Sequence, residues 1–432
     1  MQFVHGFLGL AFFCLVSWAL SSNRDRIPWR IVIGGLLMQL GFAWVFLGTG
    51  LGLSVFEAAA RFVTKLISMA APGAEMVFGP LAKPAVLAEA FGGENAFIFS
   101  FAGTGLVAII FFSALMSVLY HLGVMQVLVW GLARVMSRLL GVSGAESMSM
   151  AANVFVGQTE APLVVKPYIA KMTTSELNAM MTGGFATIAG SVLAVYVGFI
   201  GEEYGPHLLT ASVMSAPAAF VIAKIMRPEV EVPVTGGDVP LRIDRTASNL
   251  IEAAANGTTD GLKLWLNVIA MLVAFIALVN LVDWPLGYVG EAWLGMPADG
   301  SPGSLDLNYI FGYLFAPVAW IMGVEGWQDC QLFGSLLGTK IAINEFVAFD
   351  QLVGYLPGGA NEGAGFVHKR SAQMAAYALC GFANFASIGI QLGGITPLAP
   401  DRKKDIAKLA FKAMIGGAFA SWMTASVAGI FL

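Results

Sequence analysis

The chain has 432 residues, of which 57% are hydrophobic and only 12% carry a charge, about half the charged share of an ordinary soluble domain. So little charge cannot cover a water-facing surface, and the composition therefore predicts a polytopic membrane protein. The net charge of −4 and the absence of a long basic run exclude nucleic acid as a partner. The three cysteines, Cys14, Cys330 and Cys380, lie far apart in apolar contexts, which excludes a disulfide framework and a zinc site.

Eight segments are apolar over the roughly 20 residues that a spanning helix needs. They cover residues 3–20, 31–50, 96–120, 177–200, 207–226, 262–283, 371–391 and 408–432. The sequence therefore predicts an all-α polytopic membrane protein with eight transmembrane helices.

Basic residues predict the orientation of these spans. If the N-terminus is external, the first, third, fifth and seventh connections are cytoplasmic, where the positive-inside rule expects Arg and Lys. The basic residues of these connections are Arg24, Arg26 and Arg30; Arg134 and Arg138; Lys224, Arg227, Arg242 and Arg245; and Arg402, Lys403 and Lys404. Lys369 and Arg370 are exceptions, because this arrangement places them outside. We expect a multi-pass protein of the cell inner (plasma) membrane with both termini on the external, periplasmic side.

A shorter apolar stretch, residues 308–324, contains Pro317 and could be either a ninth span or a helix at the interface. A ninth span would move Arg402 and its basic neighbours to the outside. We therefore expect an external interfacial helix.

Two further segments are apolar but cannot form continuous spanning helices. Residues 146–170 are interrupted by Asn, Gly, Gln, Thr, Glu and two Pro residues, and residues 331–356 contain a lysine, an asparagine and two carboxylates before the turn at Pro357. Such a backbone is tolerated in a membrane only where it is buried in protein or lines a watery cavity. We predict two re-entrant hairpins, the first entering from the cytoplasm and the second from outside.

The two halves of the chain share a short internal repeat. The span after the first hairpin carries Gly184-Phe185-Ala186, and the span after the second carries Gly381-Phe382-Ala383. Phe155-Val156 in the first hairpin is matched by Phe346-Val347 in the second. A hairpin followed by a Gly-Phe-Ala span, found twice with opposite entry sides, is typical of an inverted-topology transporter repeat.

Polar residues gather at the predicted breaks. Gln158, Thr159 and Glu160 lie at the break of the first hairpin, and Glu345 has the matching place in the second. Because a carboxylate inside a membrane costs at least a few kcal/mol, it is a functional candidate by default. The simpler alternative is that each glutamate pairs with a nearby lysine, Lys166 or Lys340, and only fixes the hairpin.

Asn384 and Ser387 lie three residues apart and share one face of the seventh span, where they could instead be hydrogen-bonding glue between helices. Together with the hairpin residues they offer amide, hydroxyl and carboxylate groups without a fixed cation. Such a site suits a neutral solute rich in hydroxyls and amides. A nucleoside is one option, and amino acids and sugars remain open.

The motifs resemble those of the concentrative nucleoside transporters. The similar segments are Asn153-Val154-Phe155-Val156-Gly157-Gln158-Thr159-Glu160-Ala161-Pro162-Leu163, Asn344-Glu345-Phe346-Val347-Ala348 and Cys380-Gly381-Phe382-Ala383-Asn384. They occur in the family's order over nearly the whole chain. The resemblance implies a sodium-coupled secondary active transporter that imports nucleosides such as uridine and is not an enzyme.

The resemblance also implies roles for individual residues. Those expected to bind the nucleobase are Gln158, Thr159, Glu160 and Val192, and those expected at the ribose are Glu345, Phe382, Asn384 and Ser387. The co-transported sodium ion would be held by the side chain of Asn153, the carbonyls of Val156 and Ile188, and the hydroxyl and carbonyl of Thr187. Thr187 stands where the family often has Ser, which keeps the hydroxyl and adds a methyl group.

As the resemblance implies, the protein is a homotrimer in the lipid bilayer that works by an elevator mechanism, with the third and sixth spans as scaffold. The expected regions are 1–95, with spans one and two and an interfacial helix; 96–145, with the third span and a cytoplasmic interfacial helix; 146–230, with the first hairpin and spans four and five; 231–307, with an interfacial helix and the sixth span; and 308–432, with the external helix, the second hairpin and spans seven and eight.

Two alternatives remain at this point. Protons could replace sodium through Glu160 or Glu345, since membrane carboxylates also serve as proton relays. The second alternative is a channel or a membrane enzyme, although the chain lacks the motifs G-x-S-x-G, H-E-x-x-H and Walker A.

Overall fold

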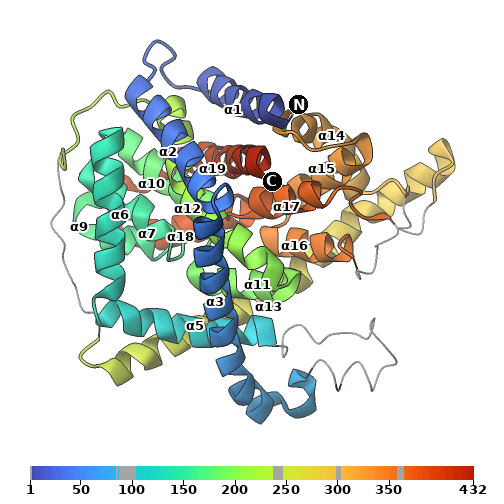
Figure 1. The fold of residues 1–432 in the computed structure, drawn as a ribbon, viewed down its shortest axis with the longest axis horizontal. Helices are drawn as coiled ribbons and strands as arrows, with labels where there is room; N and C mark the ends of the chain where they lie inside the picture. The colour runs from blue at the N-terminus through green and yellow to red at the C-terminus, as the bar shows by residue number, and fades with distance from the viewer. Residues whose placement is uncertain (1, 84–85, 87–103, 237–246, 298–302, 358–363) are drawn as a thin grey trace.

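The computed structural model describes residues 2–83, 86, 104–236, 247–297, 303–357 and 364–432, and it is all-helical over these residues (Figure 1). The predicted spans correspond to α1 (Gln2–Ala19), α2 (Trp29–Leu47), α5 (Thr104–His121), α10 (Thr174–Ala186) with α11 (Gly190–Ile200), α12 (Gly205–Met226), α13 (Leu250–Val289), α17 (Lys369–Leu379) with α18 (Phe385–Ile395), and α19 (Lys403–Phe431). Residues 96–103 of the third predicted span lie outside the described residues.

The remaining helices connect or flank these spans. They are α3 (Gly50–Phe78), η1 (Gly79–Ala82), α6 (Val124–Leu140), α7 (Gly144–Asn153), α8 (Ala161–Val164), α9 (Lys166–Ile169), η2 (Glu202–Tyr204), η3 (Gly290–Leu294), α14 (Leu307–Met322), α15 (Trp327–Ala342), α16 (Glu345–Gly354), η5 (Thr396–Leu398) and η6 (Pro400–Arg402).

Four of the helices described are individually long and apolar enough to cross a membrane: α2, α12, α13 with its extension to Leu294, and α19 with its preceding turn. The count becomes six if two bent pairs, α5 with α6 and α14 with α15, are each one span. α1 is apolar but falls just short in length. The fourth and seventh predicted spans do not pass as single helices because each is broken near its middle.

α19 lies at the centre of the protein. It contacts α10 and α17, which lie on either side of it in Figure 1, and also α12 and α1. Close approach is possible because glycines face bulky neighbours: Gly417 lies against Phe185 of α10, and Gly429 against Met374 of α17. α19 therefore joins the two repeat halves.

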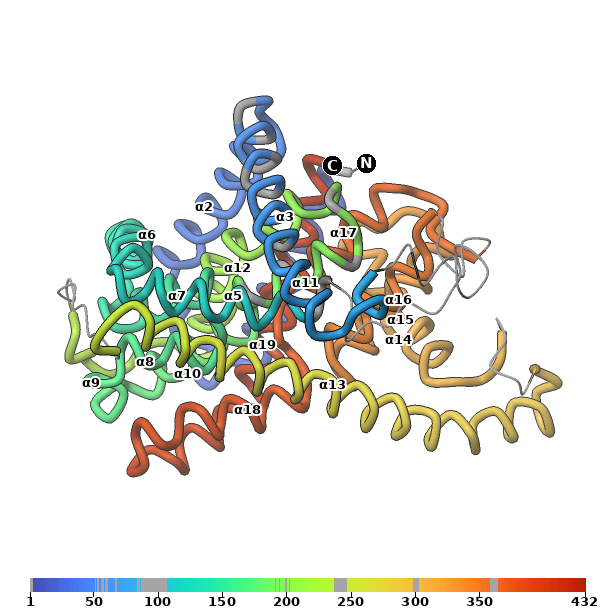
Figure 2. The backbone as a smooth tube through the Cα atoms, turned by 90° about the horizontal axis from the view of Figure 1, so that it is seen from below, coloured from blue at the N-terminus to red at the C-terminus, as the bar shows by residue number. Residues whose placement is uncertain are grey.

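α1 runs antiparallel to α19, so that the two chain ends lie side by side in both views (Figures 1 and 2). Gly6 and Gly9 of α1 lie against Ile430 and Ser426 near the end of α19. Both termini therefore lie at the same face of the protein, which an even number of spans requires.

α13 packs along α5, and α5 also contacts α11 and α3; Figure 2 shows α13 running on past this contact. A Cβ added to Gly257 would lie 2.5 Å from the carbonyl oxygen of Ser113, and one added to Gly261 would lie 2.7 Å from the Cα of Ile110. Small residues four apart allow two helices to pack backbone to backbone. Most of α13 beyond this contact is exposed and apolar, as at Val273, Leu281 and Trp284.

The first hairpin begins at a capping box formed by Ser143 and Glu146, and its first arm is α7. The chain then leaves the helix and forms the short helices α8 and α9, each with a proline near its start. The second hairpin turns between α15 and α16, where Asn344 caps α16 by accepting from the N–H of Val347 at 2.9 Å. The segment expected as an external helix is α14, which meets α15 at a bend of 111°. Both predicted hairpins are thus present as interrupted helices.

The two broken spans are a feature that the hydropathy pattern did not reveal. The predicted span 177–200 is divided at residues 187–189, and the predicted span 371–391 is divided at residues 380–384. In the second break Gly381 has a φ of 132°, a conformation that favours glycine. Each Gly-Phe-Ala motif lies at a break, and the repeat therefore marks discontinuous spans.

Candidate solute and cation site

Four interruptions of the helices approach one another inside the protein: residues 154–160, 187–189, 343–344 and 380–384. The N–H of Gly190 donates to the carbonyl of Phe155 at 3.0 Å, which ties the first hairpin to the break between α10 and α11. A Cβ on Gly381 would lie 2.8 Å from the carbonyl oxygen of Ala186, so the two Gly-Phe-Ala motifs touch. Broken backbone from both halves is thus concentrated in one region.

Glu345 is the best-connected polar group of this region. Its side chain is buried, and it accepts hydrogen bonds from the hydroxyl of Tyr196 at 3.1 Å and the side-chain amide of Asn384 at 2.7 Å. It is also the first residue of α16, where the helix dipole favours a negative charge. The carboxylate is therefore held in a fixed place between the second hairpin, α11 and the break before α18.

Asn384 and Ser387 lie together as predicted, and their arrangement is that of a helix cap. Asn384 precedes α18, and its Oδ1 accepts from the backbone N–H of Ser387 at 2.8 Å. Both side chains are buried. Asn384 uses its oxygen on the helix and its nitrogen on Glu345, so it links the cap of α18 to the carboxylate.

The three polar residues of the first hairpin differ in their surroundings. Gln158 is buried and its Oε1 has no hydrogen-bond partner, whereas Thr159 is half-buried and lies against Gly394 of α18. The Glu160 side chain is exposed, and its carboxylate lies over Gly157. Thr159 thus faces α18 and Gln158 packs on Gly184 of α10, whereas the Glu160 side chain is exposed.

The residues expected to hold a cation lie at the junction of the first hairpin and the break after α10. Asn153, Val156, Thr187 and Ile188 are all buried. The Asn153 amide donates to the carbonyl of Ser149 at 3.1 Å, while its Oδ1 is buried without a hydrogen-bond partner.

Gly183 of α10 lies close to both Asn153 and Thr187. Its backbone carbonyl accepts from the Thr187 hydroxyl at 2.9 Å, and a Cβ at the same glycine would lie 3.4 Å from the Asn153 amide. An unpaired amide oxygen close to a hydroxyl and to the irregular backbone after α10 is the kind of all-oxygen environment that a hard cation takes. The residues present fit a sodium ion.

Val192 is buried on α11, and Phe382 is half-buried in the break before α18. Both side chains are apolar and make no hydrogen bond to the other candidate residues, and their roles stay predictions.

The contacts of Lys340 do not support the lysine-pairing alternative for Glu345, since no ion pair joins the two side chains among the described residues. The Lys340 ammonium is fully buried and donates to the carbonyl of Ala378 at 2.7 Å and the hydroxyl of Ser421 at 2.9 Å. It joins α15 to α17 and α19 instead. Lys166 is exposed, and no ion pair between it and Glu160 occurs among the described residues.

Two residues of the region were missed by the sequence reasoning, Tyr196 and Gln391. Tyr196 packs against Phe349 with ring centroids 4.4 Å apart and points its hydroxyl at Glu345. Gln391 of α18 is fully buried and donates to the carbonyl of Met181 at 3.0 Å. A polar group within an apolar span is the signal that could have identified both.

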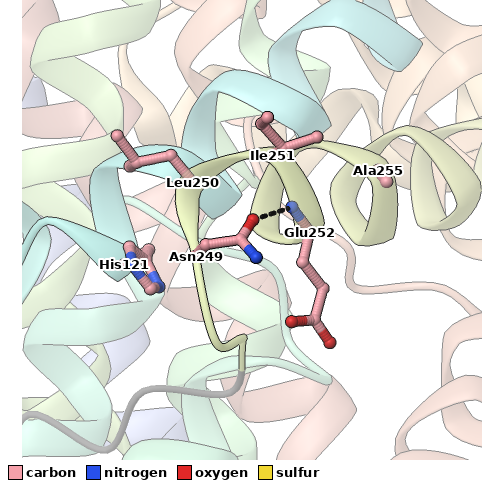
Figure 3. Close-up of a pocket in the computed structure, with 6 residues that line it drawn as sticks. All are labelled: His121, Asn249, Leu250, Ile251, Glu252 and Ala255. Atoms are coloured by element: carbon pink, nitrogen blue, oxygen red, sulfur yellow. Dashed lines mark hydrogen bonds between the residues drawn. The ribbon is translucent and has the colours of Figure 1, made fainter.

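A cavity of about 760 Å³ lies elsewhere, at the end of α5 and the start of α13 (Figure 3). Its polar groups are already used to begin α13: Asn249 accepts from the N–H of Glu252 at 2.9 Å, and Glu252 accepts from the N–H of Ser248 at 2.7 Å. The remaining lining residues are His121, Leu250, Ile251 and Ala255. We do not assign this cavity to the solute, because its polar groups do not converge on the space.

Three profiles of protein families match this chain, and together they cover most of its length. The profile described as "Na+ dependent nucleoside transporter C-terminus" matches residues 207–429, and the corresponding N-terminal profile matches residues 8–81. A third profile, "Nucleoside recognition", matches residues 104–203.

The individual proteins that this chain is similar to are also transporters. An "Uncharacterized transporter" of Haemophilus influenzae is 42% identical over 100% of this chain and 98% of its own length. The "Sodium/nucleoside cotransporter 1" of Rattus norvegicus is 39% identical over 98% of this chain, which spans 63% of that longer protein. The solved structure of CNTnw in an inward-facing substrate-bound state is 39% identical, with a TM-score of 0.89 over 100% of this chain and 98% of that one.

Proposed function

Because the chain belongs to the family of sodium-dependent nucleoside transporters, we propose that it imports nucleosides into the cell by symport with sodium. The observation that carries this proposal is the meeting of four helix interruptions around buried polar groups, of which Glu345 is fixed and Gln158 is partly unpaired. Discontinuous helices around a central polar site are typical of secondary transporters.

The two ends of a nucleoside need different partners. Gln158, Thr159 and Glu160 would face the nucleobase, because an amide offers both a donor and an acceptor to the edge of a heterocycle. Val192 would pack against the flat face of the base.

The ribose would lie at the other end of α18. Glu345 can accept hydrogen bonds from vicinal hydroxyls, and Tyr196 and Asn384 keep its carboxylate in place. Asn384 and Ser387 would add polar contacts, and Phe382 would line the sugar side.

Sodium would bind between the first hairpin and α10, at Asn153, Val156, Thr187 and Ile188. The unpaired Oδ1 of Asn153 supports this assignment, because a buried oxygen without a partner is costly unless something binds it. Sodium at this place would steady the hairpin break that presents Gln158. Linkage then requires that the nucleoside raise the affinity for sodium by the same factor.

For transport itself we propose an elevator arrangement in a homotrimer. α5 and α13 would form the fixed scaffold, and the two hairpins would move with α10, α11, α17 and α18. The close packing of α5 on α13 and the exposed apolar length of α13 support this division. We also propose that both termini are external, which their common face and the distribution of basic residues support.

The proposal is tested by uptake of labelled uridine into proteoliposomes of the purified protein. One arm has an inward sodium gradient at equal pH, and the other has an inward proton gradient in choline. Accumulation driven by sodium is the expected result. Accumulation driven by protons alone would move the coupling to Glu160 or Glu345, and no uptake in either arm would contradict the nucleoside assignment.

A further inference from the structure

Gln391 is a buried amide that the recognition scheme above does not use. It is 0% exposed on α18, its Nε2 donates to the carbonyl of Met181 on α10 at 3.0 Å, and its Oε1 has no hydrogen-bond partner. A fully buried amide that satisfies only half of its hydrogen-bonding capacity needs an explanation.

The neighbour of Gln391 is Gln158, and the two meet across a glycine. A Cβ on Gly184 of α10 would lie 2.6 Å from Nε2 of Gln391 and 3.0 Å from Cβ of Gln158. The backbone of α10 is therefore in contact with both glutamines at one residue. Gln158 also has a buried Oε1 without a partner, so both glutamines that pack on Gly184 have an unsatisfied amide.

The face of α18 that carries Gln391 also carries groups of both halves of the proposed site. Ser387, Gln391 and Gly394 share one helix face because they are spaced at i, i+4 and i+7. Ser387 lies at the ribose end, and Gly394 lies against Thr159 of the first hairpin. One rigid helix thus sets the distance between the ribose groups and the break that presents Gln158.

We propose that Gln391 is a positioning residue for nucleobase recognition, which anchors α18 to α10 and holds Gln158 at a fixed distance from the ribose groups. This inference rests on the proposed function, because it deepens the role of the same site. Gln391 acts through Gln158 and not by its own contact with the ribose.

The chain offers a matched control. Gln39 of α2 is also 0% exposed, donates from Nε2 to the hydroxyl of Thr424 at 2.9 Å, and has an Oε1 without a partner. It joins α2 to α19, away from the helix interruptions. Gln39→Met and Gln391→Met therefore remove the same groups from equally buried places.

The experiment measures sodium-driven uridine uptake for Gln391→Met, Gln158→Met, the double variant and Gln39→Met. For Gln391→Met we expect KM to rise about tenfold, as for one lost hydrogen bond, with the maximal rate within about twofold of the parent. In the Gln158→Met background the same change should raise KM by less than about twofold, because two residues that act as one unit are not additive. Gln39→Met should leave KM unchanged.

Equal effects of Gln391→Met in both backgrounds would overturn the inference, and so would an unchanged KM in the single variant. If Gln391→Met does not elute as a single species from size exclusion, Gln391→Asn replaces it. Asparagine keeps the amide, but its side chain is one methylene shorter. An equal KM rise for Gln39→Met would show a general effect of buried amides and would also overturn it. Failure of the parent protein to take up uridine would contradict the proposed function instead.

Discussion

Asn153 and Asn178 show how the surroundings of one atom distinguish the proposed sodium ligand from a structural residue. Both are buried, and both donate a side-chain hydrogen bond to a backbone carbonyl: Asn153 to Ser149 within α7, and Asn178 to Ala223 across to α12. The Oδ1 of Asn153 is left without a partner next to the Thr187 region. Residue type alone therefore says little, and an unpaired oxygen that lies at a hairpin break is what supports a ligand at Asn153.

Replacing Asn153 by Ser should mainly raise the sodium concentration needed for half-maximal uridine uptake. We expect an increase of about tenfold, the size of one lost oxygen contact, with near-normal uptake at saturating sodium. Asn178→Ser is the control and should leave the sodium dependence unchanged. The measurement is a sodium titration of uptake, and equal sodium shifts in the two variants would argue against a cation at Asn153.

Replacing Glu345 by Gln should weaken nucleoside binding without affecting assembly. The change removes the charge that accepts from Tyr196 and Asn384, and hydrogen bonds to a charged group contribute about 1.5–3 kcal/mol. Uridine affinity measured by calorimetry should therefore fall by more than about tenfold. Asp350→Asn removes an exposed carboxylate from the same helix α16 and should leave affinity unchanged. Loss of a single elution peak in Glu345→Gln would instead indicate a structural role.

At the scale of secondary-structure elements, polar contacts between helix ends hold the first hairpin against its neighbours. The Lys224 ammonium of α12 lies 2.6 Å from the Glu146 carboxylate of α7, and both side chains are 2% exposed. Lys224 also donates to Ser175 of α10 at 3.0 Å. Three elements that are separate in sequence are thus joined by one buried cation.

Lys224→Met should destabilise the protein strongly, because it leaves the Glu146 carboxylate buried without its partner, a loss of about 3–5 kcal/mol for a buried pair. The double variant Lys224→Met/Glu146→Gln should regain most of the stability. Lys263→Met is the control, since Lys263 pairs with Asp260 at the exposed surface, where a pair contributes little. Thermal midpoints from size exclusion after heating are the measurement, and a double variant no more stable than Lys224→Met would contradict this account.

At the scale of the whole molecule, the centre of the protein and the edge formed by α13 differ in how they are covered. α12 and α19 are buried by other helices, whereas no residue in the most apolar stretch of α13 is buried, and many of its side chains are exposed. Its exposed residues include Ile276, Leu281 and Trp284. Lipid or other protomers must cover this surface, because large apolar patches do not face water.

The homotrimer proposal predicts a particle of three protomers in mild detergent. Light scattering coupled to size exclusion, corrected for bound detergent, measures the protein mass directly. We expect three times the protomer mass, independent of protein concentration, because an apolar interface along α13 would be obligate. The mass of a single protomer would contradict the trimer and would leave α13 to lipid alone.

Much of the fold and part of the candidate site follow from local sequence. The lengths of the apolar segments predict the spans, because a bilayer of fixed thickness requires a fixed helix length. Prolines and charged groups in 146–170 and 331–356 predict the hairpins, because broken backbone in a membrane must be buried in protein. Glu345, Asn384 and Gln158 are recognisable for the same reason, since polar groups inside a membrane are costly.

Only the tertiary structure decided which of these groups meet. The breaks in 177–200 and 371–391 occur where Gly381 packs on the backbone of α10, a contact between residues far apart in sequence that hydropathy cannot register. The same holds for Tyr196 at Glu345, for Gln391 beside Gln158, and for Lys340, which bonds to α17 and α19. Local sequence determined which polar groups enter the membrane, whereas packing between the two halves determined the partner of each.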